Sequence, residues 1–232
     1  AETFKQIPGT PIAYWASESM RKAFGSNSPV SHYATPRSGF STGDNDRYIH
    51  FWWENEAWSF ESNRRSLRSP ANGYWFPMNK GGFFRKWYGN NIYTVNWKNN
   101  AQEMKECAGY RSGCENYYYL PGITWSSISS SSISVRYSPS GFMPNRKGAM
   151  AYAESESDLL YALAFLNSSV AKAFLSILAP TLDFSEGPVG SVPLVYRNEK
   201  NVISAASFTV DQSKSDYDSF ETSWDFKRHP LV

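Results

Sequence analysis

The chain has 232 residues, which suits one large or two small domains and is long enough to bury a hydrophobic core. Hydrophobic residues make up 41% of it, and the formal net charge of +2 does not by itself indicate a nucleic-acid partner. No apolar run approaches the roughly 18 residues that a membrane span needs, and no signal peptide is visible. We therefore expect a soluble, cytoplasmic protein with no membrane partner.

The first third of the chain is rich in turn signals. Residues 20–24 predict a brief helix after a Ser-Glu-Ser step. The polar Gly, Asp and Asn residues of 37–47 indicate a loop, and residues 48–53 predict a strand.

The middle of the chain favours strands and loops. Residues 92–97 alternate apolar and polar side chains and are rich in β-formers, which predicts a strand. Residues 117–120 and 123–125 predict a strand pair around Pro121-Gly122, and the Ser-rich residues 126–134 indicate a loop or a strand.

The clearest helical pattern covers residues 157–178, where leucines and other apolar residues recur at helical spacing. Asn167-Ser168 interrupts the pattern and is able to cap a second helix, which predicts a bent helical pair ended by Pro180. Residues 189–195 return to β character, and the chain beyond Ile203 becomes polar and acidic. Together these elements predict a mixed α/β (α+β) fold: a twisted, partly antiparallel sheet with the bent helical pair packed against it.

Two cysteines, Cys107 and Cys114, are the only ones in the chain. No second Cys or His pair lies near them, which argues against a structural zinc site. Two cysteines also do not make a secreted disulfide scaffold, although a single disulfide between them stays open. We therefore expect no bound metal.

Basic residues are concentrated between residues 62 and 102. This stretch contains seven Lys and Arg residues and no Asp or Glu, so it carries +7 and leaves −5 for the rest of the chain. Separated charge of this kind gives a field with a direction, which steers a polyanion. The alternative is a solvated surface whose acidic partners come from other segments in space.

Cations, rings and amides alternate in residues 83–91, with the sequence FFRKWYGNN. Arg and Lys bind phosphates or guanine edges, and Asn can pair with adenine. Rings in such a run are more often buried than stacked on bases, so the alternative is that Phe83, Phe84 and Trp87 belong to the core and the charges only border it.

The residues of a catalytic site are missing from the sequence. The three histidines have no metal-ligand spacing, and neither a nucleophile elbow nor a phosphate loop occurs. Glu103-Met104-Lys105 resembles the end of a nuclease motif but lacks its paired Asp, so we interpret it as an exposed helix start. Nothing fits an S-adenosylmethionine pocket or the Asn/Asp-Pro-Pro-Tyr/Phe loop of amino-methyltransferases. We therefore expect a binding module without catalytic residues.

Six strings spread over nearly the whole chain carry a family resemblance. They are FKQIPGTPIAYW (4–15), TGDNDRYIHFWWE (42–54), KGGFFRKWYGNNIYTVNW (80–97), GITWSSIS (122–129), LLYALAFLNSSVAKAFLSILAPTLDFSEGPVGSVPL (159–194) and DSFETSWDFKRHPL (218–231). In this order they resemble the C-terminal specificity region of BREX-type (PglX-type) adenine-specific DNA methyltransferases. That region is related to the TaqI-like specificity domains of type IIG restriction-modification enzymes.

The resemblance implies a division of labour within a longer parent protein. In this family a preceding catalytic domain binds S-adenosylmethionine and methylates adenine N6, in a phage-defence or restriction-modification system. The present region resembles the part that clamps double-stranded DNA and reads its sequence. It implies residues 1–210 as a DNA target-recognition domain and residues 211–232 as a segment leading into the rest of the parent. The implied partners are double-stranded DNA, the parent's catalytic domain and other defence proteins, with no cofactor in this chain.

The resemblance also implies a role for each candidate residue, according to whether the residue lies inside or outside a shared string. The shared string at 80–97 implies framework or phosphate contacts for Lys80, Arg85, Lys86 and Asn90. Segments outside the family pattern, 63–74 and 105–114, are the expected base readers. The predicted DNA-binding residues are Arg64, Arg65, Arg68, Lys80, Arg85, Lys86, Asn90, Lys98 and Arg111.

Two other binding functions remain open from the sequence. The chain could be a protein-docking module that links the methyltransferase to other defence components, in which case an aromatic surface rather than the basic stretch forms the main patch. It could also be a carbohydrate-binding module that uses Trp52, Trp53 and Trp87, although this does not account for the basic stretch.

Overall fold

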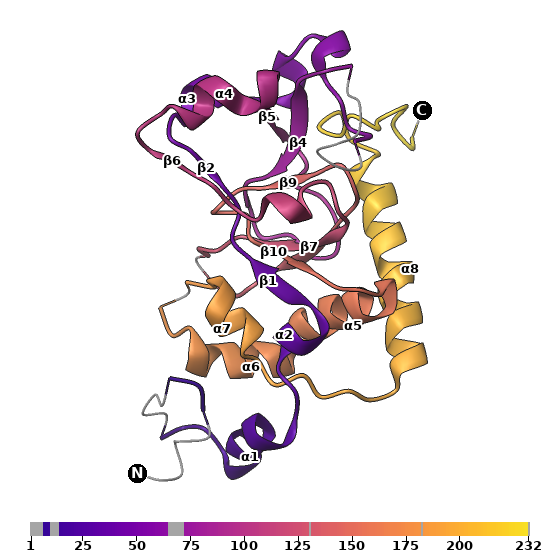
Figure 1. Ribbon diagram of the computed structural model, residues 1–232. Helices are drawn as coiled ribbons and strands as arrows, with labels where there is room; N and C mark the ends of the chain where they lie inside the picture. Colours follow the sequence, from indigo (N-terminus) through magenta and orange to yellow (C-terminus); the bar gives the residue numbers. More distant parts are fainter. Residues whose placement is uncertain (1–6, 10–13, 65–71, 130, 182, 232) are drawn as a thin grey trace.

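The computed structural model describes residues 7–9, 14–64, 72–129, 131–181 and 183–231. Helices and strands are mixed throughout, which confirms the predicted α/β class. The β-structure is divided among two four-stranded sheets and one two-stranded sheet in the described chain. Each four-stranded sheet has its own hydrophobic cluster, called here the lower core and the upper core after their places in Figure 1.

The lower core lies on an antiparallel sheet and is covered by helices. The strands, in spatial order, are β1 (Thr35–Arg37), β10 (Met150–Tyr152), β7 (Gly122–Trp125) and β8 (Val135–Ser138). Helices α2 (Val30–Tyr33), α5 (Glu156–Leu166), α6 (Ser169–Leu178) and α7 (Glu186–Gly190) lie at the lower end of the molecule with α1 (Glu18–Ser26) beneath them (Figure 1). The α1 helix confirms the helix predicted around residues 20–24.

The upper core contains many rings. Its sheet has the order β3 (Ile49–Phe51), β5 (Tyr93–Asn96), β4 (Trp75–Asn79) and β9 (Met143–Pro144), with only the β4–β9 pair parallel. The short helices α3 (Asn45–Tyr48) and α4 (Gln102–Lys105) and the small sheet of β2 (Ser41–Thr42) and β6 (Tyr110–Arg111) lie beside it. Strand β5 confirms the strand predicted at 92–97, and β3 is a shorter form of the one predicted at 48–53.

The bent helical pair forms as the sequence predicts. Helices α5 and α6 meet at 75°, and the Ser168 hydroxyl accepts a hydrogen bond from the Ala171 amide at the start of α6. The pair packs on the lower core. In the described chain no single helix has the length and apolar character of a membrane span; this bent pair passes that test jointly, by length and composition only.

The polar tail predicted beyond Ile203 is helical as far as Tyr217. Helix α8 (Glu199–Tyr217) runs along the molecule from the lower end toward the upper end (Figure 1), and Ala206, Val210 and Tyr217 are buried in the lower core. Its Ser, Thr and β-branched residues have modest helix propensity, so packing against α5 rather than local preference stabilises it. Residues beyond α8 return to the upper sheet, where the Trp52 indole donates to the Thr222 carbonyl.

Two predicted strands are wrong. Residues 115–117 form a 3-10 turn and Tyr119 has a φ of 69°, so 117–120 does not pair with β7, whose partners are β10 and β8. Residues 189–195 contain the end of α7 followed by an extended segment that contacts residues 28–30 at separate points. Pro193 cannot donate to a ladder, which prevents a continuous strand there. Cys107 and Cys114 are free thiols.

Candidate nucleic-acid interface

The centre of the candidate site is the loop of residues 80–91 between β4 and β5, called here the aromatic loop. Its first turn needs Gly81 and Gly82, which have φ values of 89° and 139°. Two side chains then fasten it: the Ser126 hydroxyl donates to the Gly82 carbonyl at 3.0 Å, and the Asn90 amide donates to the Phe83 carbonyl at 2.8 Å. The path of the loop is therefore held by hydrogen bonds at both ends.

The second half of the aromatic loop is paired with the edge of the lower sheet. The Trp87 amide donates to the Val135 carbonyl at 2.9 Å, and the Trp87 carbonyl accepts from the Tyr137 amide at 2.7 Å. Tyr88 is buried in the lower core and Trp87 packs against it. These contacts attach the loop to β8 and leave its first half projecting.

Phe83 and Phe84 lie on that projecting half and are 90% and 56% exposed. The expectation that both belong to the core is wrong for these two rings, although it holds in part for the half-buried Trp87. The physical reason is that Trp87 and Tyr88 already occupy the lower core. The two phenylalanines are therefore available to a partner.

A turn distant in sequence, Asn145–Gly148, lies against the start of the aromatic loop. The Asn145 amide donates to the Asn79 carbonyl at 2.9 Å, and a Cβ added at Gly148 would stand 2.2 Å from that same carbonyl oxygen. This close approach requires glycine at 148. It brings the backbone of Arg146 and Lys147 beside the backbone that carries Lys80.

Lys80, Arg146 and Lys147 together are called here the basic cluster. Arg146 and Lys147 are exposed, and within the described ranges no Asp or Glu oxygen lies within 4.0 Å of any of the three cations. The Lys80 ammonium lies 4.8 Å from the centre of the Tyr93 ring. Burial lowers the pKa of Lys80, and the charge of Asp46 opposes that shift. The basic cluster thus presents cations without close acidic partners.

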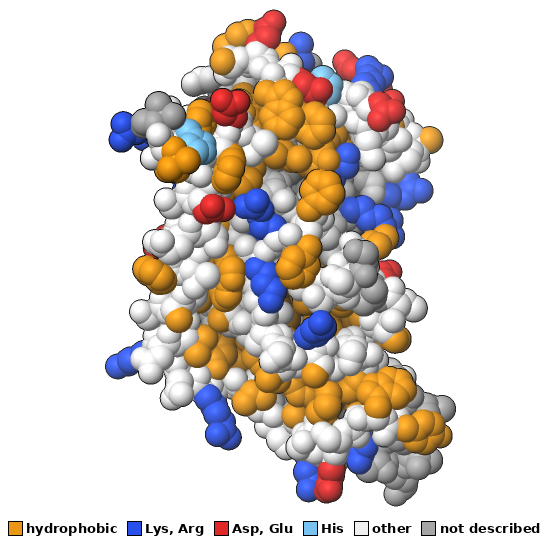
Figure 2. All heavy atoms as spheres, turned by 180° about the vertical axis from the view of Figure 1, so that it is seen from behind, with side chains coloured by type: hydrophobic (Ala, Val, Ile, Leu, Met, Phe, Trp, Pro, Cys, Tyr) orange, Lys and Arg blue, Asp and Glu red, His pale blue; other side chains and the backbone are white. Residues whose placement is uncertain are grey.

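Stacked rings continue the surface from Lys80 along the upper sheet. Tyr93 and Phe51 stack at 5.2 Å, and Phe51 and Trp53 stack at 4.7 Å with planes 8° apart. On the face opposite the view of Figure 1, Lys and Arg side chains lie among hydrophobic ones along the middle of the molecule, with few acidic side chains between them (Figure 2). The chain therefore combines cations and rings on its surface.

Two of the predicted cations in the loop are engaged by neighbouring helices. Arg85 lies 3.9 Å from a carboxylate oxygen of Asp216 and 5.4 Å from the centre of the Tyr217 ring, both near the end of α8. Lys86 donates to the Asn167 carbonyl at 2.8 Å, at the junction of α5 and α6. For Arg85, the alternative that acidic partners come from other segments in space is thus partly correct.

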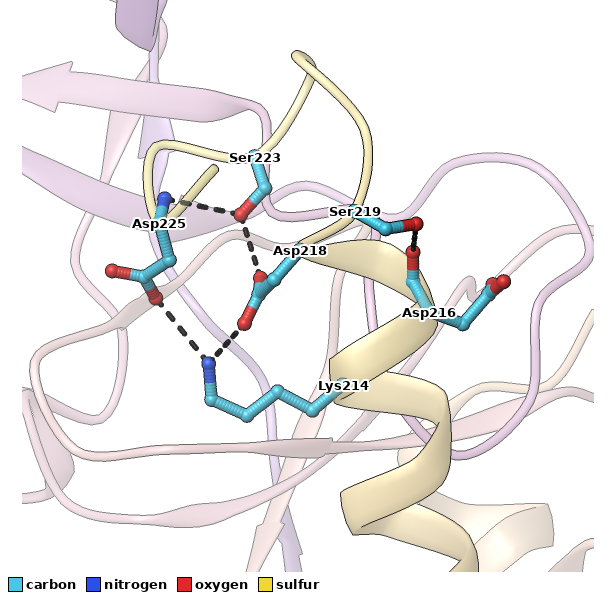
Figure 3. A network of polar contacts seen from close by, with 6 residues as sticks. All are labelled: Lys214, Asp216, Asp218, Ser219, Ser223 and Asp225. Carbon is cyan, nitrogen blue, oxygen red and sulfur yellow. Dashed lines mark hydrogen bonds and ion pairs between the residues drawn. The ribbon is translucent and has the colours of Figure 1, made fainter. Parts of the chain in front are cut away.

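Two carboxylates beyond Asp216 form ion pairs with a single lysine (Figure 3). Lys214 forms ion pairs with Asp218 and Asp225, and the Ser223 hydroxyl donates to Asp218 at 2.7 Å. Burial acts to lower the pKa of Lys214, but the hydrogen bond to Asp218 and the nearby negative charges raise it above its ordinary value. This network holds the C-terminal segment on α8 and offsets two of the acids near the aromatic loop.

A buried cation, Arg136 of β8, lies beneath the loop. Its side chain is 1% exposed, donates to the Arg85 carbonyl at 3.3 Å and leaves its Nε without a partner. Burial, with a further contribution from the charge of Arg85, lowers the pKa of Arg136 to about 10, so the group remains charged at neutral pH. No Asp or Glu oxygen of the described residues lies within 4.0 Å of it. A buried charge without a counterion adds positive potential under the loop.

The contacts described for three further predicted residues involve other parts of the chain. The Arg64 guanidinium is 3.3 Å from the Tyr119 hydroxyl, Lys98 lies over the Tyr74 ring, and Arg111 donates to the carbonyls of residues 108 and 110. Neither Lys98 nor Arg111 has a hydrogen bond, ion pair or cation–ring contact to the loop in the part of the chain that is described. Arg65 and Arg68 lie outside the described residues.

Sequence reasoning missed Arg136, Arg146 and Lys147. All three lie outside the basic stretch of 62–102, and only the turn-like Asn-Arg-Lys-Gly of 145–148 could have pointed to two of them. The rings proposed for carbohydrate binding do not form one flat platform: Trp52 and Trp53 are 84° apart in plane, and Trp87 packs on the lower core.

One testable consequence concerns Asn90, which sits at a φ of 63° and fastens the loop to Phe83. Replacing Asn90 with Ala should lower the free energy of unfolding by about 1–2 kcal/mol, because a hydrogen bond is lost and alanine is strained at this φ. Urea unfolding measures the change, with the exposed Asn116→Ala as control. Equal stabilities of the two variants would contradict this role.

Among the described residues, no group of three or more His, Cys, Asp and Glu side chains could hold a metal ion. What the site offers is binding chemistry: cations for phosphates and exposed rings for apolar contact.

No protein-family model matches the chain. It is 37% identical over 237 residues to the adenine-specific methyltransferase PglX of Lacticaseibacillus casei (strain Zhang), and this match covers 99% of the chain and 20% of that protein. It is 34% identical over 232 residues to the adenine-specific methyltransferase BrxX of Escherichia coli O9:H4 (strain HS), covering 99% of the chain and 18% of that protein. The chain therefore spans about a fifth of the length of these relatives. The resemblance to PglX-type methyltransferases is supported to this extent, whereas the relation to TaqI-like specificity domains stays a prediction.

Proposed function

We propose that this chain is the DNA target-recognition region of a bacterial phage-defence methyltransferase that modifies adenine N6. The observation that carries the proposal is the basic cluster: its three cations have no carboxylate within 4.0 Å among the described residues, and the turn of Arg146 and Lys147 lies against the start of the loop that carries the exposed Phe83 and Phe84. The likeness of the whole chain to part of two adenine-specific methyltransferases supplies the class of enzyme.

The physical case for DNA rests on electrostatics. A cation already paired with a carboxylate gains little from a phosphate, whereas an unpaired one displaces counterions from the duplex and so strengthens binding. Lys80, Arg146 and Lys147 belong to the second kind, and their backbone is held by the contact of Gly148 with Asn79. Arg136 adds charge beneath the loop. In the predicted set, Arg85 and Lys86 would then mainly position the loop.

Methyl transfer is assigned in this proposal to the rest of the parent chain, together with S-adenosylmethionine. The residues present do not fit that cofactor well. A cavity of about 350 Å³ lies among Tyr33, Tyr117 and Tyr152, but its lining includes Glu154 and Asp158 and no Lys or Arg. The lining therefore offers no basic side chain to pair with the carboxylate of the cofactor's methionine. The chain by itself is therefore expected not to methylate DNA.

The proposal also covers the domain division. Residues 1–210 would form the recognition domain, and residues 211–232 would lead into the rest of the parent. Helix α8 spans the point of division, so both parts share one helix and the C-terminal segment begins on the lower core. Double-stranded DNA and the parent's catalytic domain are the proposed partners, with other defence proteins as further ones.

The salt dependence of binding tests the proposal. The 232-residue chain, titrated against a fluorescently labelled random-sequence duplex, should lose affinity on the order of tenfold or more between about 50 and about 200 mM NaCl, because at least three phosphate contacts are involved. Fluorescence anisotropy measures the dissociation constant at each salt concentration. Binding that ignores salt, or no binding at all, would overturn the proposal and favour the protein-docking alternative.

Exposed aromatic side chains away from the basic cluster favour that second candidate. Trp58, Tyr14 and Trp15 are 66%, 80% and 65% exposed. Large exposed rings are typical of protein interfaces. A docking role for these rings is compatible with DNA binding by the basic cluster, because the two sets of residues do not overlap.

A further inference from the structure

We infer that Phe83 and Phe84 form an apolar wedge that enters the DNA duplex between neighbouring base pairs while phosphates bind the basic cluster. This inference rests on the proposed function and adds to it a mode of contact: the loop distorts the duplex and does not only touch its backbone.

The first observation is the exposure of the two rings. Phe83 is 90% and Phe84 is 56% exposed, although burial of an apolar ring away from water is favourable. Adjacent phenylalanines at the projecting part of a loop are the side chains that minor-groove and architectural proteins insert between base steps. Both rings therefore suit a partner that offers an apolar, stacked interior.

The second observation is that the loop is already held in place. The Ser126 hydroxyl holds the Gly82 carbonyl, the Asn90 amide holds the Phe83 carbonyl, and Trp87 is paired with β8. A wedge must resist the force of the stacked bases, and a loop with fixed ends loses little conformational entropy on binding. This arrangement differs from that of an unanchored surface loop.

The third observation is the charge around the rings. Lys80 precedes the glycine turn, Arg85 follows Phe84, and the turn with Arg146 and Lys147 lies against the start of the loop. Beneath them Arg136 is buried, with no carboxylate within 4.0 Å among the described residues. An exposed apolar pair on a loop with cations at its start matches a polymer whose surface is anionic and whose interior is stacked and apolar, which is duplex DNA. A purely apolar protein surface would leave this charge uncompensated.

The test compares two duplexes of the same fixed sequence, one fully paired and one with a single central mismatch. Unstacking a base step costs a few kcal/mol and costs less next to a mismatch. The wild-type chain should therefore bind the mismatched duplex on the order of tenfold more tightly, and 2-aminopurine placed next to the mismatch should become brighter when it binds.

The informative variant is Phe83→Ala/Phe84→Ala, which should fold normally because both rings are exposed. It should bind the two duplexes with equal affinity while its salt dependence stays that of the wild type. The matched control is Phe208→Ala/Phe220→Ala, which removes two rings that are 65% and 50% exposed elsewhere and should keep the preference.

Each other result has a distinct meaning. A double alanine variant that keeps the wild-type preference and 2-aminopurine signal would overturn the wedge and leave the proposed function intact. Loss of contact with the parent's catalytic domain, with unchanged binding to both duplexes, would also overturn the wedge and assign the rings to a protein interface. Failure of the wild type to bind either duplex would overturn the proposed function itself.

Discussion

Replacing Lys80, Arg146 and Lys147 with glutamine will weaken binding to duplex DNA on the order of 100-fold at about 0.1 M salt. None of these cations has a carboxylate within 4.0 Å in the part of the chain that the structure describes, so its charge is available to a phosphate and its removal retains counterions on the DNA. The slope of log affinity against log salt should fall in magnitude by roughly three, about one for each cation removed. Anisotropy titrations at several salt concentrations give both quantities.

The matched control removes the same charge elsewhere. Lys22, Lys172 and Lys200 belong to α1, α6 and the start of α8, which lie toward the lower end of the molecule (Figure 1). Their glutamine variant should change affinity only slightly through net charge. If both triple variants lose affinity equally, only overall charge matters and the basic cluster is not a specific contact surface.

A second large effect is expected on stability. Replacing Asn167 with Ala will lower the free energy of unfolding by about 2–4 kcal/mol, because the buried Val135 amide loses its partner and the Val135 carbonyl loses one of its two donors. The Asn167 side chain accepts from the Val135 amide at 3.0 Å and donates to the Val135 carbonyl at 2.9 Å, and the residue is 8% exposed. Urea unfolding should show a lower midpoint with an unchanged slope.

The control for this variant is Asn116→Ala, which alters an exposed asparagine of the same chain. If Asn167→Ala and Asn116→Ala unfold at the same urea concentration, the two hydrogen bonds to β8 contribute nothing net. The variant should also affect the aromatic loop. The Val135 carbonyl accepts from both Asn167 and Trp87, so the bent helical pair, β8 and the aromatic loop share one hydrogen-bonding point.

That shared point shows why the aromatic loop lies where it does. Helices α5 and α6 support β8, β8 pairs with Trp87, and α8 contacts the loop through Arg85 and Tyr217. Segments more than 100 residues apart thus determine the placement of two phenylalanines. A base-reading or phosphate-binding loop needs such support, because small displacements of its side chains weaken every contact they make.

The elements that depend on local pattern could be predicted from the sequence. The leucines of 157–178 with Asn167-Ser168 between them predict α5, the break and α6, because apolar spacing and an N-cap serine act within a few residues. The alternation at 92–97 predicts β5 for the same reason. Helix α8 could not be predicted in this way, since its Ser- and Thr-rich sequence becomes helical through packing on α5.

In the candidate site, too, some features could be predicted from the sequence and others depended on the fold. The sequence by itself indicated the type of chemistry: a basic stretch with interleaved rings, and a likeness to adenine-specific methyltransferases. Only the tertiary structure decided which side chains are available. It exposed Phe83 and Phe84, engaged Arg85 and Lys86 with α8 and α5, and brought Arg146 and Lys147 beside Lys80. The physical reason is that exposure and ion pairing depend on distances in space and not on distances along the chain. The close approach of Gly148 to Asn79, for example, joins segments that are almost 70 residues apart in the sequence.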